Sequence, residues 1–354
     1  MWKKTRAANN SKTIPASGHR PLFPQKPHDI PDFWRRRTLT SYLLLPLAVF
    51  FALITACRRA LYRCGMLRRY RAPVPVLVVG NISVGGNGKT PLVQALARAF
   101  QAEGIAVGII SRGYGGTAVE ATDVATCPDA VIVGDEPLLL WQSTGAPVVV
   151  ARKRAQAAEK LLHDYHATRL ILADDGLQHY ALARDAEIAV IAADLGLGNG
   201  FLMPAGPLRE SAARLKRVDA VVHSGAGQGR ADGYVLQYAS DGVRPLGGGA
   251  LRPLASLAGK PLYALTAIAR PERFFNSLRA QGATLAATHS LPDHAAIPAD
   301  AAAFAGDGNL VISEKDAVKT AAWPEALKAR TFVVDYRAVL PPDLLPALRR
   351  KLGV

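Results

Sequence analysis

Cysteine is scarce in this sequence: Cys57, Cys64 and Cys127 are scattered along 354 residues. That spacing excludes a disulfide framework or a cysteine-based metal cluster. Acidic residues are scarce in one part of the chain, since residues 1–71 carry 15 Lys and Arg against two Asp. The other 283 residues carry 28 basic and 26 acidic side chains, so the net charge of +15 belongs to an N-terminal appendage. A nearly neutral body argues against an enzyme that acts on nucleic acid.

Charge of either sign is absent from one stretch of 20 residues, Thr38 to Cys57. About 20 apolar residues are enough for a helix to cross the hydrocarbon core of a bilayer. Arginines flank the stretch on both sides, so the positive-inside rule fixes no orientation, and an in-plane helix on anionic lipid also fits. We expect a basic, disordered tail over residues 1–37 and a membrane anchor helix with a basic flank over 38–71. A buried core helix is the alternative.

From about residue 73, short apolar runs alternate with helix-like segments. The expected strands are Val74–Val79, Ala106–Ile110, Pro147–Ala151, Leu170–Ala173, Ile188–Ala192 and Ala220–Val222, and the expected helices are Lys89–Gln101, Glu136–Ser143 and Arg152–His166. Strands that are apolar throughout are typical of a parallel sheet covered by helices on both faces. The alternation therefore predicts an α/β fold with right-handed crossovers.

A glycine-rich stretch of low hydrophobicity, Gly225 to Gly249, is interpreted as a connection between domains. Further strands are expected beyond it at Pro261–Ala267, Leu310–Ser313 and Thr331–Val334. We therefore expect one domain over residues 72–228 and a second, smaller α/β domain over 229–354.

A phosphate-binding P-loop is predicted between the first expected strand and the first expected helix of this region. Its residues are Ser83, Val84, Gly85, Gly86, Asn87, Gly88, Lys89 and Thr90. Small residues let backbone N–H groups converge on phosphate oxygens, and the helix N-terminus adds its dipole. We expect Lys89 to reach the β- and γ-phosphates and Thr90 to offer its hydroxyl to Mg²⁺. The consensus begins with glycine where this chain has Ser83, and a glycine-rich turn without a ligand is the alternative to a P-loop NTPase-type domain.

Two acids, Asp174 and Asp175, directly follow the strand expected at Leu170–Ala173. One carboxylate there can face Mg²⁺ or its water while the other orients partners. Acids at strand ends are also common as solvated turn residues, so the interpretation depends on the P-loop. The guanine-reading Asn-Lys-x-Asp tetrapeptide is absent, which favours ATP over GTP.

A kinase also needs a group that positions the acceptor hydroxyl. Three unusual polar loops supply candidates, at residues 111–116, 134–137 and 176–179.

A series of motifs in a fixed order is more specific than any one of them. They are Val79–Pro91, Ser111–Gly115, Val133–Pro137, Asp174–His179, Gly198–Gly200, Leu202–Glu210, Arg217–Ala220, Arg270–Phe275, Pro292–His294 and Glu314–Val318. In these motifs the sequence resembles the tetraacyldisaccharide 4'-kinase family, the lipid A 4'-kinases, over most of its length. Ser83 also fits that family's P-loop pattern. The chain departs from the family at Ala295–Ala296, where a second His or a polar residue is common.

The resemblance implies that the γ-phosphoryl group of ATP is transferred to the 4'-hydroxyl of tetraacyldisaccharide 1-phosphate, giving lipid IVA for lipopolysaccharide. It also implies ATP and Mg²⁺ as cofactors, and attachment to the bacterial inner membrane with the active site on the cytoplasmic face. An anionic membrane surface is then the expected partner beside the lipid substrate. A lipid with four acyl chains does not leave the bilayer, so an attached enzyme meets a concentrated substrate.

Carried onto matching positions, the resemblance makes Asp135 the base that accepts the 4'-hydroxyl proton and His294 its partner in a dyad. Lys89 and Arg209 complete the expected catalytic set. Each has a structural alternative: Asp135 as the N-cap of the next helix, His294 as a helix-start histidine, and Arg209 as a surface charge.

The expected Mg²⁺ ligands are Thr90, Asp174 and Asp175. The expected nucleotide-binding residues are those of the P-loop, Ser83 to Thr90, together with Arg112, Tyr114, Gln178 and His179. Tyr114 packing in a turn and the Gln178–His179 pair fixing its own loop are the alternatives.

Two other functions stay open. A membrane-associated P-loop kinase for another glycolipid needs Lys89, Thr90 and Asp174, but not the full series of loops. A non-catalytic P-loop ATPase switch needs neither Asp135 nor His294.

Overall fold

The structure, a computed structural model, describes residues 30–85, 88–193, 195–225 and 233–354. Most of the expected basic tail therefore lies outside it, as do Gly86 and Asn87 of the P-loop and part of the expected connection. The part of the tail that it does describe, residues 30–37, is ordered. Trp34 Nε1 there donates a hydrogen bond of 2.9 Å to the carbonyl of Pro204.

The described strands form one continuous sheet. They are β1 (Val76–Gly80), β2 (Val107–Ser111), β3 (Thr122–Asp123), β4 (Val148–Val150), β5 (Leu170–Asp174), β6 (Ala186–Ala192), β7 (Ala220–Ser224), β8 (Tyr234–Pro245), β9 (Leu262–Thr266), β10 (Leu285–Ser290), β11 (Asn309–Ile312) and β12 (Thr331–Val339). Their order across the sheet is β10-β9-β11-β12-β8-β7-β6-β1-β5-β2-β4-β3. All neighbours are parallel except the β8–β12 and β3–β4 pairs, so the predicted parallel α/β fold is confirmed.

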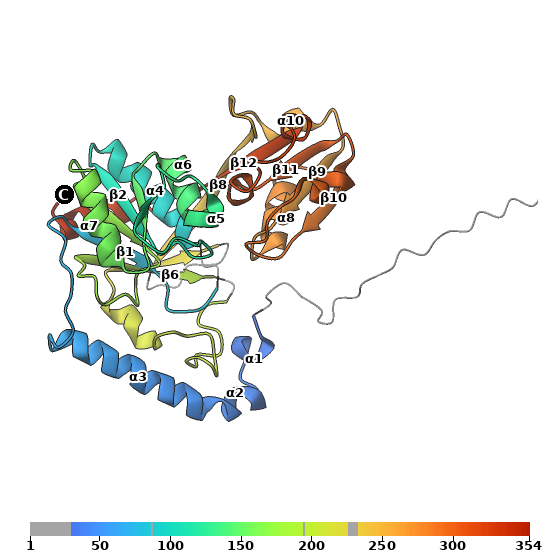
Figure 1. Cartoon of the computed structure of the whole chain (residues 1–354). Coiled ribbons are helices and arrows are strands. Elements are labelled where there is room, and N and C mark those ends of the chain that lie inside the picture. Colours follow the sequence, from blue (N-terminus) through green and yellow to red (C-terminus); the bar gives the residue numbers. More distant parts are fainter. Residues whose placement is uncertain (1–29, 86–87, 194, 226–232) are drawn as a thin grey trace, which may run out of the picture.

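Helices cover the sheet and extend below it. They are α1 (Asp32–Arg35), α2 (Leu39–Leu43), α3 (Leu45–Arg63), α4 (Lys89–Ala102), α5 (Ala130–Val133), α6 (Asp135–Thr144), α7 (Arg154–Asp164), α8 (Pro271–Ala280), α9 (Glu314–Ala317), α10 (Glu325–Ala329) and α11 (Leu344–Leu352), with 3₁₀ turns at Ala212–Arg217, Leu254–Leu257 and Ala299–Ala305. Figure 1 shows two lobes, with α3 running beneath the first.

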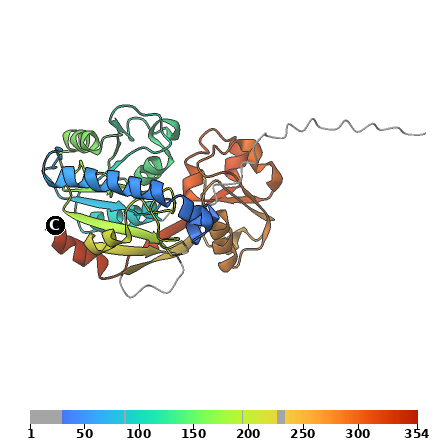
Figure 2. The ribbon, with the colours of Figure 1, turned by 90° about the horizontal axis from the view of Figure 1, so that it is seen from below.

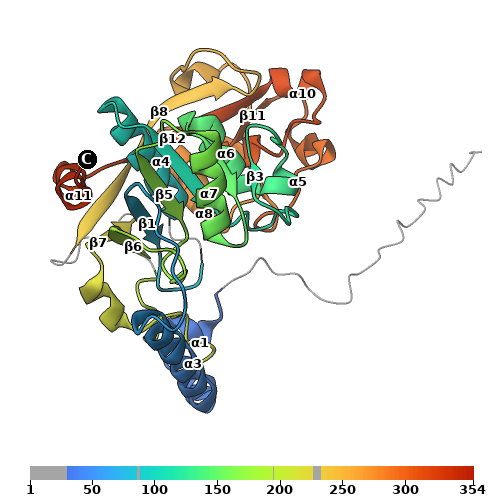
Figure 3. The same cartoon turned by 60° about the vertical axis from the view of Figure 1, so that its left-hand side comes forward.

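The first lobe is a three-layer sandwich around strands β7, β6, β1, β5, β2 and β4. Helices α4, α6 and α11 pack on one face of these strands, and α7 packs on the other. Figure 3, in which the lobe is turned, shows α11 beside the strands and α3 separate below them. Leu77 and Leu172 point to the first face and Val78 and Ile171 to the second, and all four are buried. Full burial on both faces explains why these strands are apolar throughout.

Strand β8 corrects the interpretation of Gly225–Gly249 as a connection. Its start pairs parallel with β7, with Val222 opposite Tyr234, and the rest pairs antiparallel with β12, with Pro245 opposite Phe332. This strand is therefore shared by the two lobes. Its sequence carries no strong apolar signal because only three of its twelve residues, Leu236, Gly242 and Val243, are buried.

A division of the chain at residues 228 and 229 stays a proposal. Beyond that point the chain builds the second lobe around β9, β10, β11 and β12 and then returns to the first. Leu344, Leu348 and Leu352 of α11 are buried in the core of the first lobe.

The uncharged run Thr38–Cys57 does not form one helix, which corrects the single anchor helix expected over 38–71. It is divided at Leu44 into α2 and α3, with Pro46 in the first turn of α3. Proline has no N–H to donate to a preceding turn, so a new helix begins there. Helix α3 is still long and apolar enough to cross a membrane by length and composition. Seen from below, it lies across the first lobe (Figure 2).

The core of the second lobe contains one buried carboxylate, Asp316. It accepts hydrogen bonds from Thr266 Oγ1 at 2.6 Å, the backbone N–H of Ala267 at 2.9 Å and Ser313 Oγ at 2.5 Å. These bonds connect the end of β9 to the start of α9.

We predict that Asp316→Ala destabilises the second lobe by about 3 kcal/mol, because buried donors lose their acceptor. The loss should appear in urea unfolding followed by the fluorescence of Trp323, which is buried in that lobe. Exposed Asp307 is the matched control: Asp307→Ala should leave the midpoint unchanged. Equal stability of the two variants would contradict the prediction.

Candidate active site

The start of the P-loop is held by the segment that precedes Glu210. The Val84 N–H donates to the Pro207 carbonyl at 2.9 Å, and the Arg209 N–H donates to the Ile82 carbonyl at 2.7 Å. Ser83 is buried and forms a β-bridge with Leu208. The sequence motif that contains Arg209 is therefore a neighbour of the P-loop in space.

Two glycines, one before the P-loop and one within it, leave no room for a side chain. Gly80 ends β1, and a Cβ there would meet Leu177 Cγ at 2.8 Å. Gly88 has a φ of +77°, and a Cβ there would lie 2.6 Å from the Tyr238 hydroxyl. Both positions therefore require glycine.

Lys89 and Arg209 converge on Asp175. Lys89 Nζ lies 3.4 Å from Asp175 Oδ1, and Arg209 Nη1 lies 3.7 Å from Oδ2. Burial acts to raise the pKa of the Asp175 carboxyl, but the two cations outweigh it and hold that pKa below its ordinary value. Arg209 therefore has a carboxylate partner at the P-loop, and its catalytic role stays a prediction.

Asp174 differs from its neighbour. The register of β1 with β5 places it opposite Val79, one residue before Gly80. Its carboxyl is buried, and burial together with the charges of Glu136 and Asp175 raises its pKa to about 7. Its Oδ1 has no hydrogen-bond partner among the residues that the structure describes.

An unpartnered buried carboxylate oxygen suits a bound cation. Mg²⁺ is commonly held by one or two carboxylates, with waters and substrate phosphates completing its shell. Asp174, Asp175 and the Thr90 hydroxyl form such a donor set. Among the described residues no group of three or more His, Cys, Asp or Glu side chains is arranged to chelate a metal, and Mg²⁺ bound in this way requires none.

Asp135 binds two donors of the second lobe. Its Oδ2 lies 3.2 Å from His294 Nδ1 and 3.1 Å from Lys319 Nζ. Burial acts to raise the pKa of the Asp135 carboxyl, but the hydrogen bond from His294 and the Lys319 ammonium lower it below its ordinary value. The N-cap of α6 is Gly134, and no side chain caps this helix, so the alternative of Asp135 as an N-cap is wrong.

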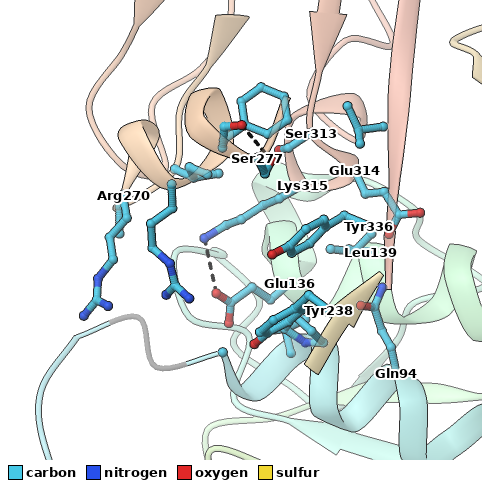
Figure 4. A pocket seen from close by; sticks show the side chains of 18 of the residues that line it. Gln94, Glu136, Leu139, Tyr238, Arg270, Ser277, Ser313, Glu314, Lys315 and Tyr336 are labelled. Atoms are coloured by element: carbon cyan, nitrogen blue, oxygen red, sulfur yellow. Dashed lines mark hydrogen bonds and ion pairs between the residues drawn. The ribbon is translucent and has the colours of Figure 1, made fainter. Parts of the chain in front are cut away.

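The tautomer of His294 follows from its other neighbour. Lys315 Nζ lies 3.3 Å from His294 Nε2 and 3.2 Å from Glu136 Oε1. An ammonium group only donates, so this contact favours the neutral tautomer with its proton on Nδ1, facing Asp135, although Asp293 Oδ2 also lies 3.7 Å from Nε2. The φ of His294 is +62°, in a turn and not at a helix start. Figure 4 shows Lys315 reaching from the second lobe to Glu136 of the first.

A cavity of about 270 Å³ lies between the lobes, lined by Lys89 and by the Glu136–Lys315 pair. The first lobe contributes Gly88, Lys89, Thr90 and Glu136, and the second contributes Lys315, Arg270 and Arg273. Tyr238 of β8 and Tyr336 of β12 line it with stacked rings, 5.0 Å between centroids (Figure 4). Through Glu136 the cavity extends from the P-loop to the neighbourhood of Asp135.

Gln178 and His179 fix their own loop. Gln178 Nε2 donates to the Asn81 carbonyl at 2.8 Å and to Glu210 Oε1 at 2.9 Å. His179 Nε2 accepts from the Arg154 backbone N–H at 3.3 Å. Burial and the nearby arginines, Arg154 foremost, lower the pKa of His179 to about 4. These contacts agree with the alternative in which the Gln178–His179 pair holds its loop in place.

The remaining expected nucleotide-binding residues lie in an exposed loop. Arg112 is exposed, and Tyr114 is 72% exposed with its ring edge-on to His294, 5.9 Å between centroids. The structure therefore brings Tyr114 to the Asp135–His294 pair and not into a packed turn.

Several residues of the site were not predicted from the sequence: Glu136, Tyr238, Lys315, Lys319 and Tyr336. Glu136 and Lys315 lie inside motifs quoted above, and Lys319 follows the last of them by one residue. The two tyrosines lie on strands whose pairing the sequence did not reveal.

Comparison with known proteins gives one consistent match. The family model for Tetraacyldisaccharide-1-P 4'-kinase matches residues 40–353. Proteins named tetraacyldisaccharide 4'-kinase are 44% identical in Dichelobacter nodosus, over 90% of this chain and 96% of that protein, and 47% identical in Chromobacterium violaceum, over 91% and 98%. A crystal structure of LpxK from Aquifex aeolicus in complex with ATP aligns with a TM-score of 0.75 at 25% identity, over 89% of this chain and 100% of the other.

We predict that Lys319→Met raises the pKa of Asp135, because a nearby ammonium no longer favours the carboxylate. The change is measured by following the Asp135 carboxyl carbon by NMR during an acid titration, in which the carboxylate protonates at a higher pH in the variant. Lys328→Met is the control, since Lys328 contacts exposed Glu325 in the same lobe. An unchanged Asp135 titration in Lys319→Met would show that the contact is not made in solution.

Proposed function

The chain belongs to the tetraacyldisaccharide-1-P 4'-kinase family, and we propose that Asp135, held by His294 and Lys319, is the base of its phosphoryl transfer. The enzyme transfers the γ-phosphoryl group of ATP to the 4'-hydroxyl of tetraacyldisaccharide 1-phosphate, a step of lipid A biosynthesis. One observation carries the proposal: a carboxylate of the first lobe meets two donors of the second beside a cavity that reaches the P-loop.

The two carboxylate oxygens of Asp135 have different partners. Oδ2 is engaged by His294 and Lys319, which leaves Oδ1 for the substrate hydroxyl. As the 4'-oxygen forms its bond to the γ-phosphorus, its proton passes to Asp135, and the bond from that phosphorus to the bridging oxygen breaks with ADP as the leaving group. A pKa below the ordinary value keeps Asp135 ionised at neutral pH, and it also makes the carboxylate a weaker base.

Lys89 and Arg209 supply positive charge to the phosphates. In the structure both contact Asp175, so an incoming nucleotide competes with that carboxylate for them. Thr90, Asp174 and Asp175 would hold Mg²⁺, which when bound would neutralise charge on the phosphates. Release of Lys89 toward the nucleotide leaves Asp175 free for the cation or its waters.

We place the nucleotide in the interlobe cavity. The start of α4, directly after the P-loop, lines the cavity together with Arg270 and Arg273 of the second lobe. The Tyr238–Tyr336 pair offers an aromatic surface for the nucleotide base. The relative solved in complex with ATP has the same fold over its whole length, which supports ATP as the nucleotide.

We also propose that α3 lies in the surface of the inner membrane, with the ATP site on the cytoplasmic side. Both ends of α2–α3 are tied to the first lobe: Ser41 lies against Asn199, and Arg59 Nη1 lies 3.3 Å from Glu210 Oε2. Its outer face exposes large apolar side chains, among them Phe50 and Leu53 at 63% each. A helix held lengthwise against the body presents this face to lipid in the manner of an interfacial helix.

We predict that Asp135→Asn lowers kcat by about 10²- to 10⁴-fold, because the amide cannot accept the proton. The assay follows labelled phosphate from ATP into tetraacyldisaccharide 1-phosphate in detergent micelles, with ATP affinity measured in parallel and expected to be unchanged. Exposed Glu120→Gln is the control and should be fully active. Full transfer by Asp135→Asn would exclude the base role, and ATP hydrolysis without any labelled lipid in the wild type would favour an ATPase switch instead.

We predict that Phe50→Glu with Leu53→Glu abolishes binding to phosphatidylcholine vesicles, because two charges replace apolar surface in the bilayer interface. Co-sedimentation with vesicles measures it. Val119 and Val131 are also exposed, at 75% and 67%, but belong to the body of the first lobe. Val119→Glu with Val131→Glu should bind as the wild type does; equal loss in the two variants would contradict a role for α3.

A further inference from the structure

A second cavity, of about 380 Å³, lies at the opposite edge of the sheet from the P-loop. Its lining includes Asp185 and Ala186, where β6 begins, whereas the P-loop follows the end of β1. Because β1 and β6 are parallel, these two sites lie at opposite ends of the strands. Arg59 and Arg63 of α3 also line the cavity, so it opens beside the proposed membrane helix. It forms no part of the phosphoryl-transfer site.

Positive charge dominates this cavity. Eight cationic side chains and three carboxylates line it. The carboxylates are already paired: Asp185 with Arg71 at 3.1 Å, Asp219 with Lys351 at 3.0 Å, and Glu187 with both Arg184 and Arg214.

Three guanidinium groups of the lining are left without a carboxylate partner. Arg63, Arg69 and Arg217 make no ion pair with any described residue, and all three are exposed at the rim. They come from α3, from the segment after it and from the turn before β7. Like charges brought together from separate segments repel, and an anion between them removes that cost. Arginine forks bind phosphate oxygens in pairs, so the chemistry of this site suits a phosphate group.

We propose that this cavity binds the phosphate of an anionic phospholipid headgroup and so holds the C-terminal end of α3 at the membrane surface. The proposal rests on the seating of α3 in the interface, and it is independent of the phosphoryl-transfer chemistry. With the apolar face of α3 among the acyl chains, Arg63 and Arg69 at the end of the helix reach the level of the headgroups. A soluble phosphate would satisfy the same cations, so the test must separate the two sources.

The chain contains a matched pair of charge variants. Arg69 and Arg217 line the cavity, whereas their neighbours Arg68 and Lys216 do not. All four side chains are exposed, so Arg69→Gln with Arg217→Gln and Arg68→Gln with Lys216→Gln remove the same charge from the same segments. Unchanged kinase activity in detergent micelles shows that each variant is folded.

The measurement is binding to phosphatidylcholine vesicles with and without phosphatidylglycerol. We expect the Arg69/Arg217 variant to lose about thirtyfold of the affinity gained from phosphatidylglycerol, and the Arg68/Lys216 variant to lose less than about fivefold. Equal losses would indicate a general basic surface, and no loss in either would leave the cavity without a role; both results overturn the proposal.

Inorganic phosphate alone, titrated by calorimetry, separates a lipid from a soluble ligand. Submillimolar binding that needs Arg69 and Arg217, with no gain from phosphatidylglycerol, would identify a soluble phosphate and overturn the lipid assignment. Wild-type protein that binds neither kind of vesicle would contradict the seating of α3, and the headgroup site with it. Wild-type binding to phosphatidylcholine with no gain from phosphatidylglycerol would overturn the headgroup site alone.

Discussion

The carboxylate of Asp135 depends on both lobes for its chemistry. It belongs to α6 of the first lobe, while the groups that lower its pKa, His294 and Lys319, belong to the second. Lys315 adds a second link between the lobes, because it contacts both Glu136 and the Nε2 atom of His294. The proposed base is therefore complete only when the lobes meet, and the cavity that extends from Glu136 to the start of α4 is bounded by the same two surfaces. Strands β8 and β12 hold the lobes in that relation by pairing along the connection.

Glu210 connects α3 to the loops beside the P-loop, much as Asp135 connects the two lobes. This buried carboxylate accepts hydrogen bonds from Gln178 and the Tyr180 hydroxyl, and Arg59 and Arg214 lie beside it. Gln178 also holds the Asn81 carbonyl at the start of the P-loop. A buried charge is tolerated when it is fully paired, and here its partners come from α3 and from the loops of the site. Helix α3 is thus part of the same packed unit as the P-loop.

The sequence predicts best the parts in which local chemistry and fold agree. Local sequence is enough to recognise the apolar run of β1, the small residues after it and the acids at the end of β5. The parallel pairing of β1 with β5 places them side by side. Asp135 and His294 lie 159 residues apart, and no spacing rule brings them together; only the family resemblance paired them.

The missed features share a cause: each depends on contacts between distant segments. Strand β8 carries no strong apolar signal because it lies between the lobes, and the contact of Lys319 with Asp135 is set by the packing of α9 against α6. The division of the uncharged run at Leu44 has a local cause, because Pro46 in the first turn of α3 has no N–H to donate to the preceding turn.

Helix α11 has a consequence for how the protein is made. Leu344, Leu348 and Leu352 complete the core of the first lobe, although they are the last part of the described chain to be synthesised. The ribosome must therefore release these residues before the first lobe closes, by which time α3 has long been outside the exit tunnel. The proposed membrane helix is therefore available to the bilayer while the core of the first lobe is still incomplete.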